Sequence, residues 1–337
     1  MAYTPDETRY SNGMAYSFCG KSGLKLPEIS LGLWHNFGHV DGFEKSKEVI
    51  HCAFDSGITH FDLANNYGPP PGSAEENFGK IFKGSLSSYR DEIIISTKAG
   101  HEMWSGPYGD GSSRKNLIAS LHQSLKRLQL DYVDIFYSHR YDGVTPIEET
   151  MQTLIDIVKS GKALYIGISK YPPHLAEKAY KILEAQGVHC LIHQDRYNLF
   201  SREVEGGILD TAERNGVGFS AFSPLAQGLL TDRYLNGIPS DSRVARNGFL
   251  KKEQVTPEKI EVIRKLNDIA LSRGESLAQM ALSWILADKR VTTVVVGASS
   301  VNQLKNNLGT LNSPKLSEED LKSIRTIVET IKTDTPK

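Results

Sequence analysis

Short apolar segments alternate with longer amphipathic segments along almost the whole chain. The short segments are rich in β-branched and aromatic residues, which is typical of strands, and a stretch long enough for a helix follows each of them. The predicted strands are 29–33, 59–63, 92–97, 132–137, 164–168, 190–193, 217–222 and 291–296. The predicted helices are 44–56, 74–82, 114–128, 147–160, 174–186, 207–215, 257–272, 276–288, 301–308 and 317–331. Eight strand–helix units predict an α/β fold in which parallel strands close into a (β/α)8 TIM barrel with the helices outside.

The competing arrangement is a doubly wound open sheet with a second domain. The chain lacks the usual fingerprint of that fold, G-x-G-x-x-G between a strand and a helix, and it also lacks G-x-x-x-x-G-K-[ST]. We therefore expect one barrel domain over residues 1–337, with extra helices near the C-terminus. Residues 14–30 predict a β-hairpin that caps the barrel. Residues 231–256 predict a long loop after the seventh strand, where barrels commonly bind phosphate groups.

Composition and charge limit the classes of function. The formal net charge is −1 and acidic and basic residues are interspersed, so we expect no nucleic-acid partner. Three scattered cysteines without a C-x-x-C pair argue against a disulfide framework or a structural zinc. The N-terminal segment is polar, and no apolar run approaches the roughly 20 residues of a membrane span. We expect a cytoplasmic protein with no membrane segment and no metal.

Three neighbouring predicted strands bring ionisable residues to their C-terminal ends, namely Asp62, Tyr67, Lys98 and His139. Barrel enzymes have their active sites at this rim. A neighbouring ammonium group lowers the pKa of a phenol, and a carboxylate keeps a buried ammonium group charged. Lys98 could therefore acidify Tyr67, and Asp62 could keep Lys98 charged. If His139 donates a hydrogen bond to a carbonyl oxygen, the set suits the protonation of an oxygen that gains charge during carbonyl reduction.

Each of these residues also has an ordinary structural role to consider. Taken singly, a tyrosine, lysine, aspartate or histidine at a strand end is more often a surface group or part of a structural ion pair. Four complementary types on three consecutive strand ends favour a catalytic site. Isomerisation or hydrolysis would require a metal cluster or paired carboxylates at the rim, and His101-Glu102 lacks the second histidine of the H-E-x-x-H zinc motif.

Long local motifs make the chain similar to a known family. It resembles the aldo-keto reductases over about residues 31–311, through GITHFDLANNYG at 57–68, STK at 96–98 and SHR at 138–140. Within that family it most resembles the branch of the bacterial L-glyceraldehyde 3-phosphate reductases and the potassium channel β-subunits, through GPPPGSAE at 68–75 and MWSGPYG at 103–109.

The resemblance implies an NADPH-dependent reductase. It makes Tyr67 the general acid, Lys98 and Asp62 the groups that tune it, and His139 the group that orients the carbonyl. The residues expected to bind the cofactor are Gly32, Trp34, Asp62, Ser169, Lys170, Gln194, Phe222, Ser223, Leu225, Gln227, Gly228, Arg233, Arg243, Gly297, Ser299, Gln303 and Asn307.

The resemblance also implies which part of the cofactor each group of these residues contacts. By the resemblance, Ser169, Lys170 and Gln194 hold the nicotinamide carboxamide, and Phe222 stacks on the nicotinamide ring, although core packing is its ordinary alternative. The loop at 223–228 with Arg233 meets the pyrophosphate. The segment 297–299 with Gln303 and Asn307 lies beside the adenosine 2′-phosphate and the adenine. The residues expected around the substrate are Trp34, His35, Trp104, Tyr108 and Arg140.

One departure from the family concerns the choice of cofactor. Many members have a basic residue where this chain has 299–304, so the charge for a 2′-phosphate would have to come from elsewhere. Arg243 and Lys252, in the long loop, are the candidates that the sequence offers.

Two functions follow from the sequence. The first is reduction of small aldehydes, such as L-glyceraldehyde 3-phosphate and methylglyoxal, by NADPH. The alternative is a cofactor-sensing regulatory β-subunit of a membrane channel, against which His139 argues because the channel subunits have asparagine there. Relatives of this kind often form homo-tetramers or octamers, so a homo-oligomer is a further expectation.

Overall fold

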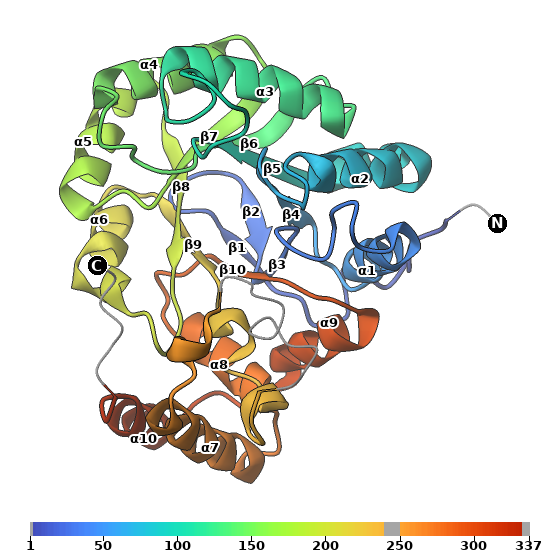
Figure 1. Cartoon of the computed structure of the whole chain (residues 1–337), viewed down its shortest axis with the longest axis vertical. Helices are drawn as coiled ribbons and strands as arrows, with labels where there is room; N and C mark the ends of the chain where they lie inside the picture. Colours follow the sequence, from blue (N-terminus) through green and yellow to red (C-terminus); the bar gives the residue numbers. More distant parts are fainter. Residues whose placement is uncertain (1–2, 239–249, 332–337) are drawn as a thin grey trace.

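Eight parallel strands close into a barrel, and they follow one another around it in chain order (Figure 1). The structure is a computed structural model, and it describes residues 3–238 and 250–331. The strands are β3 (Ile29–Gly32), β4 (His60–Asp62), β5 (Ile94–Ala99), β6 (Val133–Ser138), β7 (Ala163–Ser169), β8 (Cys190–Arg196), β9 (Gly218–Phe222) and β10 (Thr293–Val296). β10 pairs with β9 on one side and with β3 on the other, which closes the ring. The predicted (β/α)8 barrel is therefore confirmed.

Helices surround the barrel, and at least one of them follows every strand (Figure 1). They are α1 (Phe43–Asp55), α2 (Ser73–Ile81), α3 (Arg114–Leu128), α4 (Ile147–Lys159), α5 (Pro173–Glu184), α6 (Ile208–Arg214), α7 (Pro257–Ser272), α8 (Leu277–Leu286), α9 (Val301–Leu308) and α10 (Glu318–Val328). Both α7 and α8 follow β9, and α10 packs against α7. Ten helices serve eight strands, so one of α7 and α8, together with α10, makes up the additional helices that the sequence predicts near the C-terminus.

Hydroxyl side chains set where several helices begin. Ser113, Thr256, Ser276, Ser300 and Ser317 each accept a hydrogen bond from the backbone N–H three residues later. The predicted bounds of α3, α7 and α9 agree with the structure at both ends. The other helices differ from prediction by a few residues, because fraying and capping decide the last turn of a helix.

A short antiparallel hairpin, β1 (Tyr16–Phe18) and β2 (Lys25–Pro27), precedes the barrel. It covers the end where the strands begin, since Cys19 Sγ lies 3.4 Å from the Leu191 carbonyl and the Lys21 N–H donates to the Gly216 carbonyl at 2.7 Å. The predicted cap at 14–30 is thus present. Its second strand is shorter than predicted, because the chain leaves the hairpin after Pro27 and enters the barrel as β3.

Apolar side chains fill the space between the strands and the helices, and a smaller cluster fills the barrel itself. Ile135 and Tyr137 meet the hairpin residues Cys19 and Leu26 in this inner cluster. Gly167 completes the packing, because a Cβ there would lie 2.5 Å from the Tyr137 ring. The filled interior leaves the rim formed by the C-terminal strand ends as the place for a site.

In its described part, the segment between β9 and α7 is irregular apart from short 3-10 turns at Ala226–Gly228, Asp232–Tyr234 and Lys252–Gln254. Residues 239–249 of this loop, which include Arg243, lie outside the described residues. Among the helices of the described segments, none has both the length and the apolar character needed to cross a membrane.

Candidate active site at the rim of the barrel

A buried ion pair lies at the C-terminal end of β4 and β5. Lys98 Nζ donates to Asp62 Oδ2 at 2.6 Å and to the Leu63 carbonyl at 2.8 Å, and both charged side chains are essentially inaccessible. Lys98 lies within β5 rather than past its end, so its side chain points into the barrel mouth from a rigid element. Burial lowers the pKa of Lys98, and the neighbouring Asp62 carboxylate works against that shift.

Polar side chains inside the barrel hold the Asp62 carboxylate in place. Its Oδ1 accepts hydrogen bonds from Ser96 Oγ at 2.7 Å and from Gln194 Nε2 at 3.3 Å. Ser96 also contacts His60 Nε2 at 2.9 Å, and His60 Nδ1 contacts Ser30 Oγ at 2.8 Å. This chain of contacts links three strands beneath the ion pair. Burial lowers the pKa of His60 to about 4, so the imidazole is neutral at physiological pH.

Tyr67 lies in the β4–α2 loop beside this ion pair and reaches the surface of a cleft. Lys98 Nζ lies 5.3 Å from the centre of its ring. Burial, followed by the Asp62 charge, raises the pKa of Tyr67 well above the ordinary phenol value. The net shift is therefore opposite to the acidification that the sequence suggested, because burial and the Asp62 charge outweigh the effect of the ammonium group. The phenol is protonated at neutral pH, and a proton donor must start in that state.

His139 follows β6 on the other side of Tyr67, and the two rings meet edge to face with their centres 5.9 Å apart. The His101 ring packs against His139 with a centre distance of 4.5 Å. Burial, then the positive charge of Lys98, lowers the pKa of His139 well below the ordinary histidine value. A neutral imidazole offers one N–H donor to a ligand, which suits hydrogen bonding to a carbonyl oxygen.

A cleft of about 520 Å³ runs from Tyr67 across the rim. Its volume is in the usual range for sites that bind cofactors and small molecules. Of the residues that the sequence predicts to bind cofactor or substrate, those lining it are Gly32, Trp34, His35, Asp62, Phe222, Ser223, Leu225, Gln227, Gly228, Arg233, Gly297, Ser299 and Gln303. At the end of β3 the cleft is lined by Gly32, where a Cβ would lie only 2.6 Å from Val295 Cγ1 and would therefore clash with it.

The loop after β9 lines the middle of the cleft in a strained conformation. Ser223, Ala226 and Gln227 all have positive φ angles, between 45° and 59°, which non-glycine residues rarely adopt. Such strain persists where the surrounding structure requires it, and it is commonest at ligand sites. Phe222, at the end of β9, lines both this cleft and a second pocket on its other side.

Three residues expected to bind the cofactor carry polar atoms without partners. Ser169 Oγ, Gln227 Oε1 and Asn307 Nδ2 are buried, and no hydrogen-bond partner for them exists within 3–238 and 250–331. Buried polar groups are normally paired, and Gln227 lines the cleft, so the amide, hydroxyl and phosphate groups of a nicotinamide dinucleotide fit the cleft at this point. Four of the described residues that the sequence predicts to bind the cofactor do not line the cleft: Ser169, Lys170, Gln194 and Asn307.

Lys45 is a functional candidate that the sequence reasoning missed. It lies in the first turn of α1 and lines the cleft together with Ser299 and Gln303, and it also faces Ser300 and Asn302 at the start of α9. Gln303 is fixed there by hydrogen bonds to its Oε1 from Ser299 N at 2.7 Å and from Ser299 Oγ at 3.0 Å. A single lysine on an amphipathic helix gives no sequence signal, because only the barrel brings α1 and α9 together.

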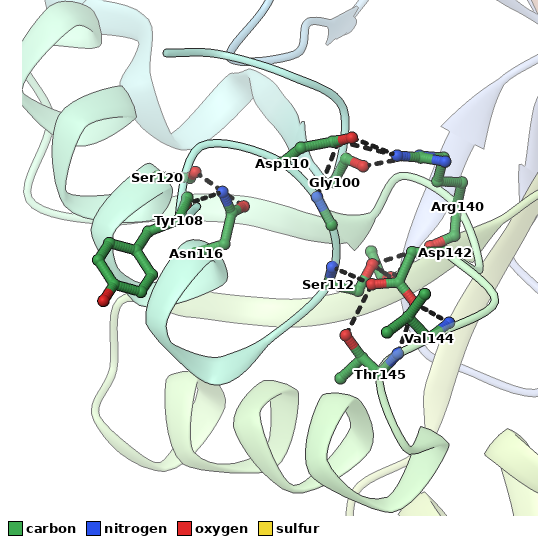
Figure 2. Close-up of polar contacts among 12 residues, drawn as sticks. Gly100, Tyr108, Asp110, Ser112, Asn116, Ser120, Arg140, Asp142, Val144 and Thr145 are labelled. Carbon is green, nitrogen blue, oxygen red and sulfur yellow. Dashed lines mark hydrogen bonds and ion pairs between the residues drawn. The ribbon is translucent and has the colours of Figure 1, made fainter. Parts of the chain in front are cut away.

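Three predicted substrate residues do not line the described cleft. Arg140 forms a bidentate ion pair with Asp110, at 2.8 and 2.9 Å, and its Nε donates to the Gly100 carbonyl at 2.8 Å (Figure 2). Tyr108 is largely exposed, and its ring points away from this network in Figure 2. Trp104 lies in the same β5–α3 loop and is also absent from the cleft lining.

A second set of hydrogen bonds, centred on Asp142, holds the β6–α4 loop beside Arg140. The Asp142 carboxylate accepts hydrogen bonds from Ser112 N at 2.7 Å and from the hydroxyl and N–H of Thr145 at 2.7 and 2.8 Å (Figure 2). Together with Arg140, these contacts join the β5–α3 and β6–α4 loops on the side of the rim where His139 lies. Arg140 thus has a visible structural task, and its role toward substrate stays a prediction.

Nothing in 3–238 and 250–331 groups three or more His, Cys, Asp or Glu side chains as a metal site would. The residues brought together at the rim are a phenol, an imidazole and a buried ammonium–carboxylate pair. This set can deliver one proton and hydrogen-bond one oxygen, and the adjoining cleft can hold an extended cofactor.

Comparison with known proteins agrees with this architecture. Residues 28–329 match the Aldo/keto reductase family. The chain is 56% identical over 329 residues to L-glyceraldehyde 3-phosphate reductase of Escherichia coli O157:H7, with 96% of this chain and 95% of the relative covered. It is 35% identical over 324 residues to a probable voltage-gated potassium channel subunit beta of Oryza sativa subsp. japonica, with 94% and 97% covered. The family predicted from the local motifs is therefore confirmed, and the chain belongs to the aldo/keto reductase family.

Proposed function

We propose that this chain reduces small aldehydes to alcohols with NADPH, and that L-glyceraldehyde 3-phosphate and dicarbonyls such as methylglyoxal are among its substrates. The name of the Escherichia coli relative supports the first of these substrates. The observation that carries the proposal is that Tyr67 and Asp62, which line the cleft, lie in contact with His139 and Lys98 respectively.

Tyr67 is the proton donor in this proposal. When bound, the reduced nicotinamide supplies a hydride to the carbonyl carbon. Tyr67 gives its phenolic proton to the carbonyl oxygen as negative charge develops there. The Lys98 ammonium group, 5.3 Å from the Tyr67 ring, offsets part of the cost of the phenolate that remains, while burial and Asp62 keep the net pKa of Tyr67 raised. Tyr67 is suited to this task because its raised pKa keeps the proton in place until the oxygen becomes basic.

His139 orients the substrate. Its neutral imidazole donates a hydrogen bond to the carbonyl oxygen and holds that oxygen beside the Tyr67 hydroxyl. The buried Nδ1 of His139 has no partner within the described residues, so the ring is held mainly by packing against His101 and Tyr67.

The test uses matched tyrosine variants. Tyr67→Phe should lose at least about 10²-fold in turnover of glyceraldehyde 3-phosphate and methylglyoxal, because the general acid is gone. It should still bind NADPH. Tyr137→Phe is the control, since Tyr137 is also buried, lies 5.3 Å from Lys98 and has a hydroxyl without a described partner. Turnover by Tyr67→Phe at the rate of Tyr137→Phe would remove Tyr67 as the acid.

Preference for NADPH over NADH is part of the proposal, and Lys45 supplies the charge for it. The cation lines the cleft together with Ser299 and Gln303, where a 2′-phosphate would meet the N-terminal end of α9. Lys252 is exposed and does not line the cleft.

Cofactor titrations test whether the Lys45 charge favours NADPH over NADH. Lys45→Gln should raise the Kd for NADPH about tenfold and leave the Kd for NADH nearly unchanged. Lys47→Gln on the same helix, where Lys47 pairs with Glu44 at 3.7 Å, is the control. An equal loss for both cofactors would refute the role of Lys45.

The whole chain is proposed to act as one cytoplasmic barrel domain, in keeping with strands that run from residue 29 to residue 296 of a single closed ring. The second candidate function is a cofactor-sensing channel subunit, which the 35% identity to the plant protein favours. A panel of glyceraldehyde 3-phosphate enantiomers, methylglyoxal and benzaldehydes separates the two. Tight NADPH retention with no turnover on the whole panel would favour the subunit.

A further inference from the structure

Phe222 separates the main cleft from a second pocket of about 710 Å³. The two cavities share Phe222, Ser223 and Gln227, so the aromatic ring and its loop form a thin wall between them. The second pocket is lined by the segments that follow β7, β8 and β9.

Two cations lie over the Phe222 ring on the side of the second pocket. Lys170 Nζ is 5.4 Å from the ring centre and Arg196 Cζ is 6.0 Å from it. Both residues line the second pocket and neither lines the main cleft. These distances are those of cation–π contacts, in which the cation draws on the negative face of the ring.

Neither cation forms an ion pair within 4 Å in the described part of the chain, although the Asp195 charge offsets part of the Lys170 charge. Within 3–238 and 250–331, Lys170 and Arg196 have no acidic side chain at ion-pair distance. Asp195 lies in the same pocket, but its carboxylate accepts the Arg196 backbone N–H at 2.7 Å and lies 3.8 Å from His193. The Lys170 backbone has a φ of 58°, and its N–H donates to the Gln194 carbonyl at 3.2 Å, so the main chain is held in an uncommon conformation.

The two redox forms of a nicotinamide differ in charge where they would meet this wall. The oxidised ring is a cation and the reduced ring is neutral. Positive charge behind Phe222 repels the oxidised ring directly, and it also withdraws electron density from the aromatic face that the ring would contact. The reduced ring feels little of either effect.

We infer that Lys170 and Arg196, acting across Phe222, weaken the binding of oxidised nicotinamide cofactor relative to the reduced form. The inference rests on the proposed function, because it requires the nicotinamide to stack on Phe222 from the main cleft. This difference in affinity has a consequence for the loading and release of the cofactor. A site that binds the reduced form better is loaded with NADPH in preference to NADP⁺ and releases the spent cofactor faster, while the equilibrium between the bound complexes moves toward the reactants.

The test measures the Kd of NADP⁺ and of NADPH by calorimetry. In Lys170→Gln and in Arg196→Gln the ratio of the NADP⁺ Kd to the NADPH Kd should fall about threefold to tenfold, the size of one screened charge acting across an aromatic ring. Asp195→Asn should raise the same ratio, because it removes a compensating negative charge. Lys170→Arg and Arg196→Lys keep the charge and should keep the ratio. Lys178→Gln, on α5 and paired with Glu148 at 2.6 Å, is the surface control.

The ratio separates this role from simple contact with the cofactor. If Lys170 only held the nicotinamide carboxamide, Lys170→Gln would weaken both forms equally, and the inference would be overturned. An unchanged ratio in both charge-removing variants would overturn it as well. Failure of the wild-type protein to bind either form would instead overturn the proposed function, and the inference with it.

Discussion

Removing the Asp62 carboxylate should expose the energetic cost of burying Lys98. The ammonium group is inaccessible to solvent, and its hydrogen bonds in the described structure go to Asp62 at 2.6 Å and to the Leu63 carbonyl at 2.8 Å. Breaking a buried pair by removing one partner typically costs about 3–5 kcal/mol, because the other charge is left uncompensated. We expect Asp62→Asn to lower the free energy of unfolding by this amount at pH 7.

The magnitude has an upper bound, because Lys98 can release its proton. Neutralising a lysine of ordinary pKa at pH 7 costs about 5 kcal/mol, so the loss in Asp62→Asn cannot greatly exceed that value. The wild-type environment already lowers the pKa of Lys98, and loss of the carboxylate lowers it further. If Lys98 is neutral in the folded variant, the unfolded chain binds one more proton than the folded chain. The free energy of unfolding then rises with pH by about 1.4 kcal/mol per unit between pH 7 and 9.

Urea denaturation at pH 7, 8 and 9 measures both effects. The double variant Asp62→Asn/Lys98→Met lacks the lysine and should show no such slope, and it should be more stable than Asp62→Asn alone. The reasoning would be refuted if Asp62→Asn lost less than about 1 kcal/mol, or if its pH dependence matched that of the double variant.

Three further predictions follow from the same structure. The free energy of unfolding should fall as the pH drops from about 6.5 toward 4, because burial lowers the pKa of His60 to about 4 while the unfolded chain takes up the proton near 6.5. His60→Asn should remove up to about 3 kcal/mol of this fall. A variant with the same pH profile as the wild type would contradict the prediction. Gly167→Ala should cost about 1–3 kcal/mol in urea denaturation, because its Cβ would lie 2.5 Å from the Tyr137 ring and 2.9 Å from the Ile192 carbonyl, whereas Gly84→Ala has open space and should be neutral. Difference absorbance at 295 nm between wild type and Tyr67→Phe, without cofactor, should show no phenolate from Tyr67 below pH 10, because burial raises its pKa; phenolate at pH 8–9 would mean that Lys98 does acidify it.

The sequence predicts the barrel well because each unit carries its own local signal. The alternation of strand and helix patterns indicates the fold, and the capping hydroxyls and the filled interior of the structure agree with it. The main local error concerns residues 24–30, where one apolar run contains both the hairpin strand β2 and the barrel strand β3. Periodicity cannot divide such a run, because both strands are extended and only tertiary pairing separates them.

The candidate site is predictable where a residue stands at a strand end, and unpredictable where a contact depends on neighbouring units. Asp62, Lys98 and His139 are found from strand ends alone. Lys45 is not, since it approaches Ser299 from a helix far away in the chain. Arg140 shows the same limit: its position after His139 suggests a substrate contact, which stays a prediction, and nothing in the sequence indicates its ion pair with Asp110 from another loop.

The pKa of Tyr67 shows why residue types alone do not fix the chemistry. A lysine near a phenol suggests an acidified phenol, but the effect depends on the net charge around it and on access to water. Here the lysine is paired at 2.6 Å with Asp62, so the pair presents little net charge to the ring. Burial then dominates and raises the pKa of Tyr67, just as it lowers the pKa of His139. Both groups are consequently neutral hydrogen-bond donors in the free protein. A site of neutral donors tolerates an uncharged carbonyl at little electrostatic cost and responds when charge develops on the oxygen, which is the differential stabilisation that catalysis requires.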